Sequence, residues 1–148
     1  MASGGYKTPP FRLLSIVAET KSPSTLRGLI CEDEGLTSLR YRQTLRRLGH
    51  PLIGSVADGE RAAEDALRLS PDAILMDIET PFLHGIEATR HVMHPRPTAL
   101  LIVSAHKDPQ TVEAALAAGA SGYLVRPDSD ERIEPALWSA REQFAARC

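Results

Sequence analysis

Residues 70–77 read Ser70-Pro71-Asp72-Ala73-Ile74-Leu75-Met76-Asp77. The helix-breaking Ser-Pro-Asp and the apolar run after it predict a short strand that is covered on both faces. This run ends at a carboxylate, Asp77. Upstream, residues 60–69 carry alanine and leucine at helical spacing. A helix that leads into a fully apolar strand indicates an α/β unit.

The same unit recurs along the chain. Apolar runs occupy residues 26–31, 52–57, 73–76, 99–103 and 122–125. Amphipathic patterns predict helices over residues 36–48, 60–69, 86–93, 109–118 and 133–144. Strands that alternate with helices in this way predict an α/β fold, a doubly wound parallel sheet with helices on both faces.

Local signals give the expected ends and faces of these helices. Pro81 and Gly85 are predicted to bracket a loop before the third helix. Asp108 is predicted to precede the fourth helix and Gly119 to follow it. The apolar face of the first helix is predicted to consist of Leu36, Leu39, Leu45 and Leu48.

Composition is that of an ordinary globular domain. The chain has 148 residues, of which 43% are hydrophobic and 24% charged, enough for one domain with a real core. We expect a domain over residues 26–148, preceded by a partly flexible extension over residues 1–25. The apolar runs are too short to cross a membrane, so we expect no membrane partner and a cytoplasmic protein.

Charge and cysteine content argue against a nucleic-acid-binding protein and against a protein held together by disulfides. The net charge is -2, and the arginines of residues 40–47 follow the acidic residues 32–34. We therefore interpret these arginines as a solvated helix face and expect no direct nucleic-acid binding. The chain has two cysteines, Cys31 and Cys148, which we expect to be unbridged.

Polar residues follow four of the predicted strands. In an open α/β sheet, sites form beyond the carboxyl ends of strands, so these residues are candidates for chemistry. Converging carboxylates repel one another unless a hard cation such as Mg²⁺ lies among them. A hydroxyl and a cation on the other side would bind phosphate oxygens, which suggests phosphoryl transfer onto Asp77. Solvated loop acids are the alternative. The candidates are Glu32, Asp33, Glu34, Asp77, Ser104 and Arg126.

Residues 26–140 resemble the receiver domain of bacterial two-component response regulators. The resemblance rests on five motifs that occur in the family's order and spacing. They are Leu29 to Glu34, Pro71 to Asp77, Pro81 with Gly85, Leu101 to Ala105, and Ala118 to Pro127. It implies the flavodoxin-like form of the doubly wound fold, a five-stranded parallel sheet in the strand order 2-1-3-4-5.

The resemblance also implies a metal site and a phosphoacceptor. Asp77 matches the phosphoacceptor aspartate. Glu32 and Asp33 match the acidic pair that holds Mg²⁺, together with Asp77 and the backbone carbonyl of Glu79. Arg126 stands where the family has lysine, and an arginine is not a conservative replacement for a lysine.

Two further residues match the family's switch. Ser104 matches the hydroxyl that moves toward the phosphoryl group, and Tyr123 matches the aromatic residue that follows it inward. The simpler interpretations are that Ser104 caps the next helix and that Tyr123 only packs. His91 and His94 have a spacing that could bind zinc, but we interpret them as a frayed helix end.

The resemblance implies a signalling role rather than an enzyme, apart from the domain's own phosphoryl transfer and dephosphorylation. A histidine kinase would phosphorylate Asp77 with Mg²⁺. The face made by the fourth helix, fifth strand and last helix would then bind an output partner or a second copy of the chain. The first alternative is a degenerate receiver that binds proteins without phosphorylation. The second is a nucleotide- or flavin-binding protein, which the absence of a glycine-rich phosphate loop argues against.

Overall fold

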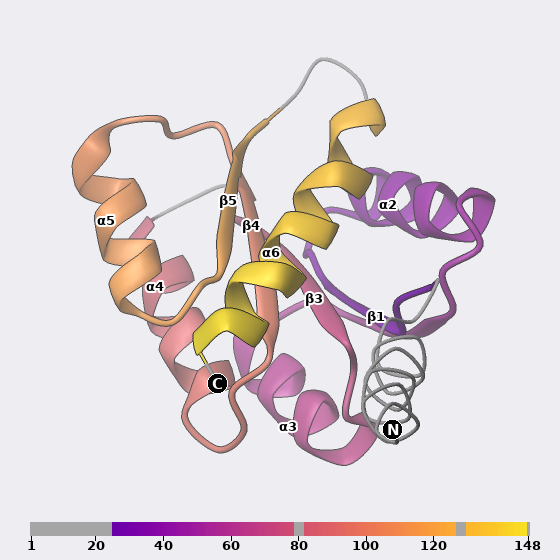
Figure 1. The fold of residues 1–148 in the computed structure, drawn as a ribbon, viewed down its shortest axis with the longest axis horizontal. Coiled ribbons are helices and arrows are strands. Elements are labelled where there is room, and N and C mark those ends of the chain that lie inside the picture. Colours follow the sequence, from indigo (N-terminus) through magenta and orange to yellow (C-terminus); the bar gives the residue numbers. More distant parts are fainter. Residues whose placement is uncertain (1–24, 79–81, 127–129, 148) are drawn as a thin grey trace, which may run out of the picture.

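The computed structural model describes residues 25–78, 82–126 and 130–147 (Figure 1). Five parallel strands form one sheet in the order β2-β1-β3-β4-β5, which confirms the predicted fold and strand order. The strands are β1 (Gly28–Cys31), β2 (Leu52–Val56), β3 (Ala73–Ile78), β4 (Ala99–Ser104) and β5 (Gly122–Val125). The helices are α2 (Gly35–Arg47), α3 (Gly59–Leu69), α4 (Phe82–Met93), α5 (Pro109–Ala117) and α6 (Ile133–Arg147), with a short 3-10 helix, η1 (Asp130–Arg132), before α6.

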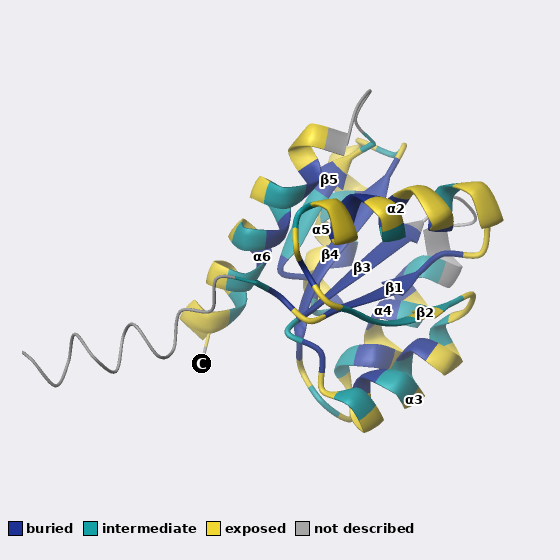
Figure 2. Cartoon of the chain, turned by 90° about the vertical axis from the view of Figure 1, so that its right-hand side faces the viewer, coloured by how far each residue is buried: buried dark blue, intermediate teal, exposed yellow. Residues whose placement is uncertain are grey.

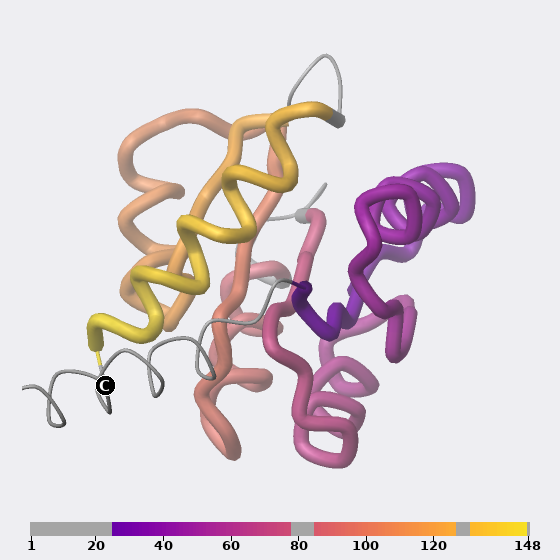
Figure 3. Tube along the Cα trace, turned by 45° about the vertical axis from the view of Figure 1, so that its right-hand side comes forward, coloured from indigo at the N-terminus to yellow at the C-terminus, as the bar shows by residue number. Residues whose placement is uncertain are grey.

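Two apolar cores lie on opposite faces of the sheet. Side chains of α3, α4 and α5 pack on one face, and side chains of α2 and α6 pack on the other. The strands are largely buried between these layers, while the outer faces of the helices are exposed (Figure 2). The trace in Figure 3 shows α6 running along β4 and β5.

Carboxylates begin three of the helices. Asp58 accepts a hydrogen bond from the backbone N–H of Arg61 and caps α3. Asp108 caps α5 in the same way, with Pro109 as the first helical residue, as predicted. This excludes the interpretation that Ser104 is the cap of α5. Glu34 caps α2 through the N–H of Thr37.

The predicted apolar face of α2 is right for Leu45, which is buried, but wrong for Leu36 and Leu39. Leu36 is 75% exposed and Leu39 is 39% exposed. The buried residues of this helix are Ser38, Tyr41, Thr44 and Leu45. Because residues three and four apart share a helix face, a stripe from Ser38 through Leu45 turns Leu36 and Leu39 toward solvent. The buried face of α2 is thus half polar and half apolar, and it places hydroxyl groups against the sheet.

The predicted loop at Gly85 is also wrong, because Gly85 lies inside α4. A glycine inside a helix costs about 1 kcal/mol relative to alanine, which tertiary packing can offset. Here Ile86, Thr89 and Val92 are buried one turn apart on this helix. Pro81 lies outside the described residues, as do residues 1–24 of the predicted extension and Cys148.

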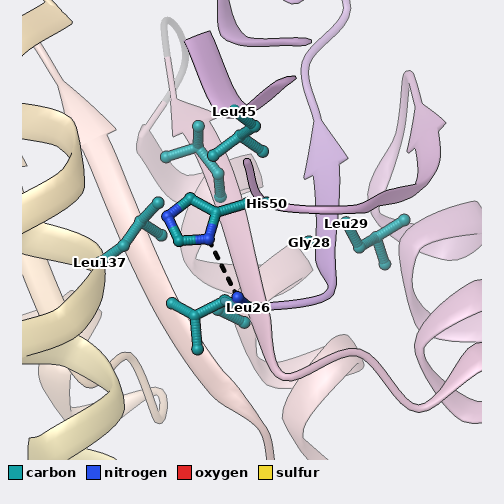
Figure 4. Close-up of a pocket in the computed structure, with 8 residues that line it drawn as sticks. Leu26, Gly28, Leu29, Leu45, His50 and Leu137 are labelled. Carbon is teal, nitrogen blue, oxygen red and sulfur yellow. Dashed lines mark hydrogen bonds between the residues drawn. The ribbon is translucent and has the colours of Figure 1, made fainter. Parts of the chain in front are cut away.

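His50 links the residue pair before β1 to helix α6. Its Nδ1 accepts a hydrogen bond of 3.0 Å from the backbone N–H of Leu26, and its Nε2 lies 2.9 Å from Oε2 of Glu134 in α6. Figure 4 shows the ring among the apolar side chains of Leu26, Leu45 and Leu137. In the part of the chain that the structure describes, no helix has the length and apolar character needed to cross a membrane.

Candidate functional site

Asp77 is the centre of the candidate site. It is the fifth residue of β3, the middle strand of the sheet, and its side chain is 0% exposed. Tyr41 donates its hydroxyl to Oδ2 of Asp77 at 2.5 Å, and Nη2 of Arg126 donates to Oδ1 at 2.6 Å. Each carboxylate oxygen of Asp77 therefore accepts a short hydrogen bond.

The alternation of side chains along β3 explains this position. Ala73 and Leu75 belong to the core on the α2 and α6 face, so Asp77 points to the same face. Tyr41, on the buried face of α2, lies in that core and is 0% exposed. Burial of the strand thus brings a carboxylate against a helix that presents a phenolic hydroxyl.

Arg126 reaches Asp77 from the end of the neighbouring strands. Its backbone N–H donates to the carbonyl of Ser104 at 2.7 Å, one residue beyond the last β4–β5 pair. Its guanidinium group is 24% exposed, whereas the carboxylate it pairs with is sealed from solvent. Nη1 lies 3.5 Å from the hydroxyl oxygen of Tyr41, so the three side chains form one cluster.

The tyrosine of this cluster is a neutral donor. Burial raises the pKa of Tyr41, and the hydrogen bond to Asp77 and the charge of that carboxylate raise it further. The cations Arg126 and Arg40 oppose this shift more weakly. The phenol therefore keeps its proton at neutral pH and donates it to Asp77.

An acidic region lies at the end of β1, next to β3. Glu32 is buried and Asp33 is exposed, and the backbone N–H of Asp33 donates to Oε1 of Glu32 at 3.0 Å. Burial raises the pKa of Cys31 to about 12, with further contributions from the negative charges of Asp58, Glu32 and Asp33. Cys31 is a free, buried thiol, and the neighbouring carboxylates add to a pKa shift that burial mainly causes.

The predicted magnesium ligands fit the ion in chemistry but are not gathered around one point. Glu32, Asp33 and Asp77 supply carboxylate oxygens, which Mg²⁺ prefers, and they follow or end neighbouring strands. Among the described residues, no group of three or more histidine, cysteine, aspartate or glutamate side chains is placed to hold a metal ion. Asp77 is held by Tyr41 and Arg126 instead. Glu79 lies outside the described residues.

Ser104 and Tyr123 are linked through the backbone of His106. Ser104 is buried at the end of β4, and its Oγ accepts a hydrogen bond of 3.0 Å from the N–H of His106. Tyr123 donates its hydroxyl to the carbonyl of the same residue at 2.6 Å and is partly buried. The two predicted switch residues thus both form hydrogen bonds with the backbone of His106.

Tyr41 is the site residue that the sequence analysis missed. The leucines of α2 suggested a different buried face, which left Tyr41 outside the predicted core. The available signal was the spacing of Ser38, Tyr41 and Leu45, which share one face of a helix. His91 and His94 lie at the end of α4, and no zinc site forms there in the described structure.

Residues 29–137 match the family described as the response regulator receiver domain. The transcriptional regulatory protein PdtaR of Mycobacterium tuberculosis is 35% identical over 118 residues, which are 80% of this chain and 58% of that protein. The chain thus spans little more than half the length of this relative.

Two solved structures have the same fold. The signal receiver domain of the putative response regulator NarL from Mycobacterium tuberculosis has a TM-score of 0.72 and 28% identity, covering 81% of this chain and 98% of that one. The CheX-CheY-BeF3-Mg+2 complex from Borrelia burgdorferi has a TM-score of 0.70 and 25% identity. It covers 76% of this chain and 87% of that one.

Proposed function

The chain belongs to the family of response regulator receiver domains of two-component systems, and we propose that it is a switch phosphorylated on Asp77. One observation carries the proposal. Asp77 is a fully buried carboxylate in the central strand, paired with the cation Arg126 and close in register to Ser104. A buried carboxylate with its own cation is a candidate nucleophile for phosphoryl transfer.

The proposed reaction is transfer from the phosphohistidine of a histidine kinase. A carboxylate oxygen of Asp77 forms a bond to phosphorus while the bond between phosphorus and the imidazole nitrogen breaks. The electron pair of that bond leaves with the imidazole, and the product on this chain is an acyl phosphate. Arg126 supplies positive charge beside the transferring group, as the lysine of the family would.

Glu32, Asp33, Asp77 and the backbone carbonyl of Glu79 are the residues that would hold Mg²⁺. When bound, the ion would neutralise charge on the transferring phosphoryl group. The carboxylates of Glu32 and Asp33 at the end of β1 favour a cation there. The solved neighbour that contains BeF3 and Mg+2 supports the same ion for this chain.

The proposed output is a change in the surface of α5, β5 and α6. Ser104 would exchange its bond with His106 for one with the phosphoryl group, and Tyr123 would then lose its fixed partner. The exchange shifts the population between two states of this face. Its partners would be an output protein or domain, or a second copy of the chain. Dephosphorylation catalysed by the chain itself and a cytoplasmic location are parts of the same proposal.

The test is the intact mass of the protein after incubation with acetyl phosphate and Mg²⁺. We expect a gain of one phosphoryl group that a chelator prevents and that is absent in Asp77→Asn. Full labelling of Asp77→Asn would place the acceptor elsewhere. Glu113→Gln is the matched control, because Glu113 is an exposed carboxylate on α5, outside the candidate site.

A receiver that binds proteins without phosphorylation is the second candidate. The observation that favours it is the occupation of both Asp77 oxygens by Tyr41 and Arg126. This function requires that folded wild-type protein gain no mass under the same conditions. The beryllofluoride complex, which mimics the acyl phosphate but does not hydrolyse, separates absent phosphorylation from rapid dephosphorylation. Failure to bind beryllofluoride would favour the second candidate.

A further inference from the structure

We propose that Tyr41 is a gate on Asp77: its hydroxyl holds Oδ2 in a closed resting state, and phosphoryl transfer requires that hydroxyl to leave. The inference rests on the proposed function of Asp77 and adds a residue that sets how readily this site is phosphorylated. Tyr41 touches the reacting carboxylate directly, with its oxygen 2.5 Å from Oδ2.

In the closed state each oxygen of the Asp77 carboxylate already accepts one short hydrogen bond. Arg126 holds Oδ1 and Tyr41 holds Oδ2, while the side chain of Asp77 has no exposure to solvent. An incoming phosphorus atom needs an oxygen lone pair of Asp77 within bonding reach. A magnesium ion needs an oxygen of the same carboxylate. Each therefore competes with a short, charge-assisted hydrogen bond from a buried phenol.

The two donors differ in what their loss would do. Arg126 brings a positive charge that a phosphoryl group could use, and its guanidinium is partly exposed. Tyr41 brings no charge, and its ring is 0% exposed within the core of the α2 face. The phenol can stabilise the free carboxylate, but it offers no positive charge to the phosphorylated product. Its hydrogen bond therefore favours the closed state.

The position of Tyr41 couples the gate to α2. Its ring packs in the apolar core, and the guanidinium carbon of Arg40 lies 5.5 Å from the ring centroid. A small shift of α2 against the sheet would lengthen the Tyr41–Asp77 hydrogen bond without exposing the ring. A partner that binds α2 could thus open the site.

Tyr41→Phe tests the gate, because it removes the hydroxyl and keeps the ring in the core. Two quantities are compared with wild type: the initial rate of mass gain with acetyl phosphate and Mg²⁺, and the Mg²⁺ affinity from calorimetry without phosphodonor. We expect the initial rate to rise about tenfold, which matches the loss of one hydrogen bond to a charged group. We expect Mg²⁺ to bind more tightly as well.

Ser38→Ala is the matched control, since it removes another buried hydroxyl from the same face of α2, one turn away. Its partner is Ser55, so neither quantity should change. Circular dichroism and the urea midpoint of each variant show that the fold is intact.

The two readouts separate the gate from the proposed function. An unchanged or slower initial rate in Tyr41→Phe overturns the gate while leaving phosphorylation of Asp77 intact. If neither protein gains mass and neither binds beryllofluoride, phosphorylation fails as the function, and Mg²⁺ affinity decides the gate alone. Tighter Mg²⁺ binding in Tyr41→Phe then supports closure of Asp77 by the hydroxyl. Equal affinity in both proteins, including no measurable binding in either, overturns it.

Discussion

The single residue Arg126 has two roles: it is the cation of the candidate site and the counter-ion of the buried Asp77 carboxylate. Its Nη2 pairs with a carboxylate that has no solvent exposure. Leaving such a carboxylate without its counter-ion is far costlier than losing a surface ion pair. An amino group in place of the guanidinium would keep the charge but offer a single point of contact.

We therefore predict that substitutions of Arg126 lower the free energy of unfolding by different amounts. Arg126→Met should lower the free energy of unfolding by about 3 kcal/mol in urea denaturation, because Asp77 stays buried and charged. Arg126→Lys should lose less than half of that amount. Combining Arg126→Met with Asp77→Asn should recover most of the loss, since the buried charge is gone. Equal stability of wild type and Arg126→Met would show that Tyr41 alone compensates Asp77.

The burial of Cys31 predicts how slowly its thiol reacts in the folded protein. Because burial and the neighbouring acids raise its pKa to about 12, the folded protein holds the thiol proton at pH 8. In a Cys148→Ser background, where Cys31 is the only thiol, a thiol reagent such as Ellman's should react quickly in urea and very slowly with the folded chain. Rapid reaction of the folded protein would mean that the end of β1 opens.

The pH dependence of stability follows from the same shift. The unfolded thiol loses its proton near pH 8.5, and the folded one near pH 12. The contribution of Cys31 is thus fully present below about pH 8.5 and is lost as pH rises toward 12. Between pH 7.5 and 9.5, urea denaturation should show wild type losing about 1 kcal/mol more than Cys31→Ala. An equal loss in both proteins would contradict this assignment.

The sequence predicted part of the candidate site for a clear physical reason. Polar residues at the carboxyl ends of parallel strands meet at one edge, and Asp77 and Arg126 do lie together. Tyr41 comes from a helix, where its exposure depends on the phase of the helix against the sheet. The four leucines suggested the wrong phase. The link from Ser104 to Tyr123 passes through backbone atoms of His106, which carry no signal in the residue types.

At the scale of elements, the strands were easier to predict than the helices. A run such as residues 99–103 is covered on both faces, so its sequence is apolar throughout and needs no assignment of phase. Helix α2 has one buried stripe, but leucines also lie on its exposed side, so they do not mark which side is buried. Helix α4 begins before Gly85 because packing of its buried face outweighs the local cost of glycine.

The contact between α3 and α4 gives a prediction about two glycines. Gly59 and Gly35 are each the first residue of a helix that follows a carboxylate cap. A Cβ on Gly59 would lie 2.6 Å from Cβ and 3.0 Å from Cα of Ala88, whereas a Cβ on Gly35 would meet nothing within 4 Å. Gly59→Ala should therefore force α3 and α4 apart.

We expect Gly59→Ala to lower the free energy of unfolding by about 1–3 kcal/mol in urea denaturation. Gly35→Ala should change it by less than about 1 kcal/mol, with a small gain from the reduced freedom of the unfolded chain. Comparing the two variants separates crowding between α3 and α4 from the general effect of alanine at the first helical position. Equal effects at both positions would mean that α4 can shift freely against α3.

At the scale of the whole molecule, His50 ties the start of the sheet to the last helix. Its Nδ1 accepts from the backbone of Leu26, so the ring proton lies on Nε2 and is donated to Glu134. Trp138 packs edge-on against the ring at 5.9 Å between centroids. Figure 4 shows the ring enclosed by the apolar core of the α2 and α6 face. His50 thus contacts a residue 84 positions away in the sequence.

This connection predicts that replacing His50 lowers the free energy of unfolding more than replacing its partly exposed partner Glu134 does. His50→Phe keeps an aromatic ring beside Trp138 but leaves the buried N–H of Leu26 without its acceptor, at a cost of about 1–3 kcal/mol. Glu134→Gln, whose side chain is 35% exposed in wild type, should cost less than about 1 kcal/mol. Trp138 is the single tryptophan, so its fluorescence follows urea unfolding at this junction. If Glu134→Gln were the more damaging change, the hydrogen bond between His50 and α6, rather than the buried backbone hydrogen bond, would hold the two ends of the fold together.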